Sequence, residues 1–444
     1  MTTTYSTEPI NSAKSAIAAL TGDDNQTRYY AAWWLGKNKI QSACPFLCAA
    51  LRDERYRTEQ GGYPLRRQAA RALGQLKNPQ ALPALLTALD CEDLNLREAV
   101  VQAIAAIGDR QAIPALITLL KSHSEQPYEA IIEALGTLQA WEVRDLIAPF
   151  LQDKSERVQC AAARYLYLLT EEPQYIERLV QNLSHENMYL RWAAAFDLGA
   201  IGHLTAAEAI ISAKVADSLK LLNLKRILEA LLADEAENET SGEGKSFLLG
   251  AIDRLLLPEN RGVGVSSGEA IASLIEKLHH HNPAISSTAV ESLVQIGSET
   301  VEPLITAFLK CKDHGIQGFI IQALARIGDI RAVDLLIEVV GIEVANHCQG
   351  SVRRMAARGL GKIGSTTNDS SAIDRCIEKL NWALSNVEDW ALRYAAIVSL
   401  QEINTPETQA ILEQALQQQT DPIVRLRCQT ALENWQPAKI TINN

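Results

Sequence analysis

The residue types best suited to chemistry in this sequence are a histidine and a cysteine that are direct neighbours, His347 and Cys348. A helical pattern begins at Val352, so the pair is expected in a loop that leads into a helix N-terminus. Unpaired backbone N–H groups at a helix N-terminus favour the thiolate form of a cysteine. Histidine titrates near neutral pH and can pass a proton, and a cysteine in this setting can act as an acid or a nucleophile. The context predicts proton transfer, although a His-Cys dipeptide by itself carries no chemistry in most sequences.

Two pairs of adjacent arginines are the second set of candidates. Arg66 and Arg67 follow a glycine-containing loop that ends with Tyr63 and a proline, and Arg353 and Arg354 follow the loop of the His-Cys pair. In repeat proteins an arginine at a recurring position most often bonds the neighbouring unit. Doubled arginines behind an enlarged loop can also grip carboxylates in a bidentate manner. Both interpretations are kept at this stage.

A third candidate is a cluster of large rings, Tyr29, Tyr30, Trp33 and Trp34, in a chain with only seven Trp and eleven Tyr. On a helix, residues 29 and 33 lie on one face and residues 30 and 34 on the adjacent one. The rings either seal an N-terminal cap of the core or form a stacking wall for a flat conjugated ligand.

These candidates are embedded in an internal repeat. An arginine followed seven residues later by Leu or Ile, with small residues between them, recurs along the chain, and related positions keep the spacing without the arginine. The arginine copies are Arg28/Leu35, Arg66/Leu73, Arg97/Ile104, Arg191/Leu198, Arg353/Leu360, Arg393/Leu400 and Arg425/Leu432. Successive anchors in the first part of the chain lie 31 to 38 residues apart, which is right for two helices with their turns.

The signals at the helix ends agree with this repeat. Glycine at Gly108 and Gly328 is expected to stop a helix, and Pro83, Pro114 and Pro303 are expected in the first turn of the next one. Alanine-rich faces let helices approach closely, so neighbouring units bury a continuous core. The sequence therefore predicts an all-α protein, an α-solenoid that resembles HEAT-type repeats of the short PBS-lyase class.

The repeat fails between Ala233 and Ser267, where acidic and glycine/serine-rich segments surround an apolar stretch from Phe247 to Leu257. These are linker compositions. We therefore predict a first solenoid half at residues 1–232, a linker with a docking helix at 233–266, and a second half at 267–444. Residues 66–76 match residues 353–363 in register, which suggests two related subunits fused in one polypeptide around a shared cleft.

Composition excludes several classes of function. With 444 residues, 47% hydrophobic and 21% charged, the chain is expected to fold into a large core, and a net charge of −11 argues against nucleic-acid or anionic-membrane partners. No signal peptide or membrane span is recognisable, so a cytoplasmic protein is expected. Eight cysteines without a C-x-x-C pair predict reduced thiols and no metal site. Phosphate-binding, Rossmann and hydrolase motifs are missing.

The motifs resemble those of the E/F-type phycobilin lyases of cyanobacteria, heterodimers of two HEAT-like chains. Residues 28–36 (RYYAAWWLG) and 61–67 (GGYPLRR) are similar to the E-type chain over roughly the first 230 residues. Residues from about 267 onward resemble the F-type chain, and Asn346-His347-Cys348-Gln349-Gly350 is similar to the motif of its isomerising members. Those members usually carry a second Asn where this chain has Ser351.

A single chain that joins both halves resembles the fused lyase-isomerases of this family. The resemblance implies that a bilin, phycoerythrobilin, is attached to a cysteine of a phycocyanin-type α-subunit and isomerised to phycourobilin. It implies the bilin as substrate, no cofactor, and His347 and Cys348 as the acid and base of the isomerisation. The bilin-binding residues would be Tyr29, Trp33, Trp34, Tyr63, Arg66, Arg67, Asn346, Gln349, Arg353 and Arg354. A lyase without isomerase activity, and a non-catalytic HEAT scaffold or bilin chaperone, remain the alternatives.

Overall fold

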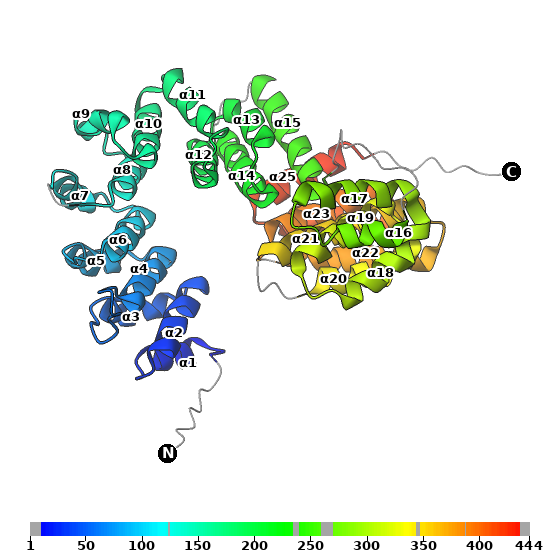
Figure 1. Ribbon diagram of the computed structural model, residues 1–444, viewed down its shortest axis with the longest axis horizontal. Coiled ribbons are helices and arrows are strands. Elements are labelled where there is room, and N and C mark those ends of the chain that lie inside the picture. The colour runs from blue at the N-terminus through cyan, green and yellow to red at the C-terminus, as the bar shows by residue number, and fades with distance from the viewer. Residues whose placement is uncertain are drawn as a thin grey trace, which may run out of the picture. The chain divides into compact units, whose positions relative to one another are not determined.

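The computed structural model describes residues 10–122, 125–233, 239–258, 270–342, 347–386 and 388–435; within them, the side chains of 239–241 and 347–349 are left undescribed. All regular structure in these ranges is α-helix or short 3-10 helix, without a strand (Figure 1). The predicted all-α solenoid of HEAT-like repeats is therefore confirmed. The chain divides into two compact units, Met1–Ile201 and Gly202–Asn444.

The first unit is a series of helix pairs. Figure 1 shows the second helices of the pairs stacked in one row, and each contacts the next. The first helices are α1 (Ala13–Leu20), α3 (Cys44–Ala50), α5 (Leu82–Ala88), α7 (Ile113–Leu120), α9 (Arg144–Ile147) and α11 (Pro173–Asn182). The second helices are α2 (Asn25–Lys37), α4 (Pro64–Leu76), α6 (Leu94–Ile107), α8 (Tyr128–Thr137), α10 (Glu156–Thr170) and α12 (Met188–Ile201).

The second unit repeats this plan after three leading helices. Those three are α13 (Ala207–Ser212), α14 (Asp217–Ala233) and α15 (Glu239–Leu256). The first helices of its pairs are α16 (Ile271–Lys277), α18 (Val301–Lys310), α20 (Val333–Gly341), α22 (Ser370–Leu384) and α24 (Pro406–Gln418). The second helices are α17 (Pro283–Ile296), α19 (His314–Ile327), α21 (His347–Thr366), α23 (Trp390–Ile403) and α25 (Pro422–Glu433).

The helix-end signals read from the sequence have the predicted geometry. Gly108 and Gly328 end α6 and α19 with φ of 79° and 73°, a left-handed conformation that side chains with a Cβ disfavour. Pro83 and Pro114 occupy the first turns of α5 and α7, where no backbone N–H is needed.

Small residues set the spacing of the second helices. A Cβ on Gly36 of α2 would lie 2.8 Å from the Cα of Ala72 on α4, and one on Gly361 of α21 would lie 2.7 Å from the Cα of Ser399 on α23. Both distances are too short for real atoms, so these helices touch through their backbones. The stacked row that positions the candidate residues depends on this contact.

The predicted loop at residues 347–351 is wrong in one respect, because the backbone is already helical at His347. Glycine weakens a helix, and the sequence pattern therefore placed the start of the helix at Val352. In the structure α21 packs against α19, α20 and α23, and Gly350 is buried. Tertiary packing thus offsets the low helix propensity of this segment.

The predicted division of the chain into 1–232, 233–266 and 267–444 stays a prediction. The boundary between the two compact units lies between residues 201 and 202 of the chain. The apolar stretch that was expected to form a docking helix belongs to α15, which begins earlier, at Glu239, and packs against α21 and α23.

Hydrogen bonds from two side chains hold α15 against the C-terminal repeats of the second unit. Arg427 of α25 donates to both carboxylate oxygens of Asp253 on α15, at 3.3 and 3.1 Å. The hydroxyl of Tyr394, a fully buried ring on α23, donates to the carbonyl of Leu249 at 3.3 Å. Burial, followed by the charge of Asp253, raises the pKa of Tyr394 well above its ordinary value, so it remains a donor.

We predict that Arg427→Ala lowers the free energy of unfolding by about 1–3 kcal/mol, the usual effect of losing a charge-assisted hydrogen bond and leaving its partner unpaired. Urea unfolding followed by far-UV circular dichroism measures the change. Arg425→Ala, on the exposed side of the same helix, is the matched control and is expected to have little effect. Equal stability of the Arg427 variant and the parent would contradict the prediction.

Candidate functional site

Three of the predicted site residues lie together in a pocket of the first unit. The segment between α3 and α4, the start of α4 and the turn before α6 enclose about 1070 Å³. Tyr63, Arg66 and Arg67 line this space, and so does Arg57, which the sequence analysis had not singled out. We call it the loop pocket.

Backbone hydrogen bonds shape the loop ahead of these residues. The N–H of Thr58 donates to the carbonyl of Gly62 at 2.8 Å, and the N–H of Gly62 donates to the Thr58 hydroxyl at 3.0 Å. Gly61 has a φ of 83°, and a Cβ on Gly62 would lie 2.2 Å from a terminal nitrogen of Arg67. Gly61 therefore permits the left-handed turn, and a side chain at position 62 would require the Arg67 guanidinium to shift.

Arg66 is held mainly by the protein itself. Its Nε donates to the carbonyl of Leu51 at 2.7 Å, which satisfies a carbonyl at the end of α3. Its guanidinium lies 4.7 Å from the ring centroid of Tyr63, a cation–π distance, and Arg57 approaches the same ring at 5.5 Å. Arg66 is only 8% exposed. Its contacts therefore support a structural role, in which the arginine bonds its own repeat.

Arg67 forms an ion pair with Asp93 at 2.9 Å. Asp93 also accepts from the N–H of Tyr63 and caps the N-terminus of α6. Burial alone would raise the pKa of Asp93, but the hydrogen bonds from Tyr63 and Arg67 outweigh it and hold the pKa below its ordinary value. About a quarter of the Arg67 side chain, 26%, remains exposed.

The second arginine pair repeats these contacts in the second unit. Arg353 Nε donates to the carbonyl of Val340 at 2.9 Å, and Arg354 pairs with Asp389, the N-cap residue of α23, at 3.0 Å. The predicted match between the two segments therefore extends to their hydrogen bonds. In both units the first arginine of the pair bonds a carbonyl of its own repeat, and the second arginine bonds the N-cap aspartate of the next repeat.

The residues predicted to carry the proton chemistry fall outside what the structure describes. Asn346 is undescribed, and of His347, Cys348 and Gln349 only the helical backbone is given. Backbone N–H groups in the first turn of a helix have no acceptor within that helix. The roles of these four residues remain predictions.

The aromatic cluster on α2 is divided between surface and core. Tyr29 and Trp33 are each 37% exposed, whereas Trp34 is half-buried against the hydrophobic core. Tyr30, a member of the cluster that was not among the predicted bilin-binding residues, stacks on Trp33 with ring centroids 5.2 Å apart. Among these rings, Tyr29, Tyr30 and Trp33 offer faces to a ligand, and Trp34 seals the core.

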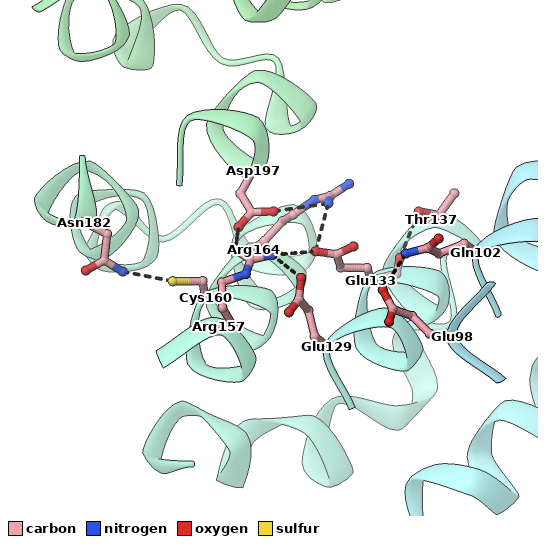
Figure 2. Close-up of polar contacts among 10 residues, drawn as sticks. All are labelled: Glu98, Gln102, Glu129, Glu133, Thr137, Arg157, Cys160, Arg164, Asn182 and Asp197. Atoms are coloured by element: carbon pink, nitrogen blue, oxygen red, sulfur yellow. Dashed lines mark hydrogen bonds and ion pairs between the residues drawn. The ribbon is translucent and has the colours of Figure 1, made fainter. Parts of the chain in front are cut away.

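A polar cluster that was not predicted from the sequence lies between α8, α10 and α12 (Figure 2). Arg157 contacts Glu129, Glu133 and the fully buried Asp197, the last at 3.2 Å, and Arg164 reaches Asp197 at 3.5 Å. Three carboxylates thus share two arginines. Burial, and then the charge of Asp197, raise the pKa of Glu133 to about 7. The residues of this cluster come from three different repeats, so no short sequence motif predicts them.

Cys160, next to this cluster, is an unreactive thiol. Its Sγ accepts from the Asn182 amide at 2.9 Å, and burial followed by the charge of Asp197 raises its pKa to about 11. The part of the chain that the structure describes holds no group of three or more His, Cys, Asp or Glu placed to bind a metal ion. None of its helices is long and apolar enough to cross a membrane.

Comparison with protein families finds two kinds of repeat in this chain. HEAT repeats match residues 63–129, 271–343 and 342–433, about half of the chain in total. The PBS lyase HEAT-like repeat matches residues 27–53 and 190–216.

Two types of relative are similar to this chain, and their matches cover different shares of its length. The bilin biosynthesis protein PecE of Mastigocladus laminosus is 63% identical over 267 residues, which are 58% of this chain and 99% of the relative. The bilin biosynthesis protein PecF of Nostoc sp. (strain PCC 7120) is 58% identical over 166 residues, which are 37% of this chain and 96% of the relative.

A solved structure is similar as well. In the complex of CpcE and CpcF of phycocyanin lyase from Nostoc sp. PCC7120, the matched chain is 46% identical, with a TM-score of 0.50. The match covers 54% of this chain and 96% of that chain.

The raised pKa of Glu133 predicts a pH-dependent stability. A carboxyl whose pKa is 4.5 when unfolded and about 7 when folded binds more protons in the folded state, so stability falls as pH rises from about 4.5 to 7. We expect Glu133→Gln to raise the midpoint of thermal unfolding by roughly 2–6 °C at about pH 8, and by less near pH 5.

Calorimetry at the two pH values measures this difference. Glu98→Gln is the matched control, because Glu98 is an exposed carboxylate at the edge of Figure 2 that accepts only from Gln102 among the residues drawn. An equal shift at both pH values, or destabilisation at the higher one, would show that folding does not raise the pKa of Glu133.

Proposed function

Because the chain belongs to the E/F-type family of phycobilin lyases, we propose that it attaches a bilin to a cysteine of a phycobiliprotein α-subunit and isomerises it. The observation that carries the proposal is that this one chain is similar to relatives of both types, at 63% and 58% identity. The PecE of Mastigocladus laminosus and the PecF of Nostoc sp. (strain PCC 7120) match over 99% and 96% of their own length, and the matches cover 58% and 37% of this chain.

The attachment step needs little covalent chemistry from this chain. The ethylidene group of a bilin is an electrophile, and the thiolate of the acceptor protein can add to it unaided. The carbon–sulfur bond forms as the exocyclic double bond takes up a proton. Control of position and stereochemistry requires that the two reactants be oriented, which is the contribution expected of the solenoid.

For the isomerisation we propose an acid–base pair. In the adduct the C4=C5 double bond moves to C2=C3 by two allylic proton shifts: C5 gains a proton as C3 loses one, and C4 then gains a proton as C2 loses one. The reaction is therefore balanced without an oxidant or a cofactor. Cys348 and His347 are assigned these two roles, because both can exchange a proton near neutral pH. Phycoerythrobilin is the proposed substrate and phycourobilin the proposed product.

The other predicted site residues are assigned to bilin binding. Tyr29 and Trp33 would stack on the conjugated rings, and Tyr63 would contribute from the loop pocket. Asn346 and Gln349, which adjoin the acid–base pair in the sequence, would also bind the bilin. Arg67 and Arg354 would contact the bilin through the N–H groups that their aspartates leave free, while Arg66 and Arg353 support them, and Trp34 supports the ring wall from the core side.

We further propose a phycocyanin-type α-subunit as the acceptor and the cytoplasm as the site of the reaction. The described cysteines are free thiols, which fits a reducing compartment. None of them needs to hold the final product, since the lasting thioether is formed on the acceptor.

Coexpression with phycoerythrobilin and an α-subunit tests the proposal. The parent chain is expected to yield a chromopeptide whose absorption is shifted to the blue, because moving the double bond shortens the conjugation. His347→Ala and Cys348→Ala are expected to yield the unshifted adduct in comparable amount. Cys311→Ala and His314→Ala, from a similar pair of residue types at the start of α19, serve as controls and should leave the product unchanged.

The same experiment separates the alternatives. A blue-shifted product from both site variants would contradict the roles of His347 and Cys348. An unshifted adduct from the parent would identify a lyase without isomerase activity. Copurification with the α-subunit but no thioether, with any bilin supplied, would identify a scaffold or bilin chaperone.

A further inference from the structure

A second pocket lies within the second unit, between its leading helices and its repeats. It encloses about 850 Å³, a volume in the range of small-molecule sites. Helices α13 and α15 form one side, and α21 and α23 form the other. We call it the junction pocket.

The base of the junction pocket is apolar and fixed in place. Leu255, Leu257 and Pro258 provide apolar surface at the end of α15. The carbonyl of Pro258 accepts from the Gln322 side chain at 2.8 Å, and the ion pair of Asp253 with Arg427 anchors the preceding turn. These contacts hold the apolar base of the pocket in place, so the pocket is preformed, as small-molecule sites usually are.

The charges of this lining leave two cations uncompensated. Glu402 is paired with Arg358 at 2.8 Å, and Asp253 is paired with Arg427. Arg254 is exposed and makes no hydrogen bond or ion pair with any residue of the described ranges. Within the described residues, Lys362 donates only to a backbone carbonyl, that of Arg326. Two positive charges therefore line the pocket without a carboxylate partner in the part of the chain that the structure describes.

Arg358, the third cation of the pocket lining, is already bonded within the protein. Its terminal nitrogen donates to Glu402 and to the Ser399 hydroxyl. Its Nε has no acceptor among the described residues, but this atom is buried, so a ligand in the pocket does not reach it. Arg254 and Lys362 are therefore the cations that can bind an anionic ligand.

We propose that the junction pocket binds the free bilin before attachment, with Arg254 and Lys362 each holding one of its two propionates. This proposal rests on the proposed function. A bilin matches the lining, because it combines a large apolar ring system with two carboxylates. Arg353 and Arg354 are less suited to this task, since their guanidinium groups already bond Val340 and Asp389.

The junction pocket is separate from the predicted acid–base pair. Arg358 and Lys362 follow the first residue of α21 by 11 and 15 positions, which is about 16 and 22 Å along the helix axis. The pocket is thus a loading site. It should determine how tightly the bilin is taken up, not which isomer is produced.

Titration of the purified full chain with phycoerythrobilin, without an acceptor protein, tests the proposal by absorbance. The double variant R254A/K362A is expected to bind about tenfold more weakly or worse, because two charge-assisted contacts are lost. R254A alone, on an exposed residue whose loss leaves the core intact, is expected to show part of the effect. The dimethyl ester of the bilin should bind the parent as weakly as the free acid binds the double variant.

R375A is the matched control, because Arg375 is an exposed arginine of α22 that pairs with Asp334 outside the pocket. It should bind the bilin like the parent. With an α-subunit present, R254A/K362A should require more bilin for half-maximal attachment but give the same ratio of shifted to unshifted product.

Two results would overturn the inference in different ways. If R254A, R254A/K362A and the parent bind the bilin equally, or if the ester binds the parent as tightly as the free acid, the junction pocket is not the loading site even when attachment proceeds. If the parent neither binds bilin nor forms an adduct, the proposed function fails along with the pocket.

Discussion

The structure depends on one recurring hydrogen bond, from the Nε of an arginine in the second helix of a repeat to a carbonyl at the end of the first helix. Its copies are Arg28 to Leu20, Arg66 to Leu51, Arg97 to Leu89 and Arg353 to Val340, at 2.7 to 3.1 Å. Each copy satisfies a helix-end carbonyl and fixes the angle within a pair. Where a second arginine follows, it bonds the N-cap aspartate of the next repeat, so a short Arg-Arg sequence aligns three helices.

Much of the fold could be predicted because its determinants are local. The spacing of Arg66 and Leu73 and the stops at Gly108 and Gly328 specify helix pairs without knowledge of distant contacts. The start of α21 could not be predicted, because burial of Gly350 against neighbouring helices outweighs its local preference. For the same reason the sequence did not distinguish exposed Trp33 from half-buried Trp34.

Sites assembled from several helices were the least predictable. Three residues of the loop pocket, Tyr63, Arg66 and Arg67, were predicted as site residues, and they are close together in the sequence. The cluster around Asp197 and the cations of the junction pocket were not, since Arg254 and Lys362 lie far apart in the chain. The proposed binding of carboxylates in the junction pocket follows from the balance of charged side chains in its lining, and this balance becomes apparent only in the folded structure.

The central claim is that this chain isomerises a bound bilin by proton transfer, removing protons from C3 and C2 and delivering others to C5 and C4. Running the coupled reaction in deuterium oxide, followed by proton NMR of the isolated chromopeptide, tests it most directly. Separate acid and base groups predict one deuterium at C5 of the product. Only protium at C5, or a retained C4=C5 double bond, would contradict the account.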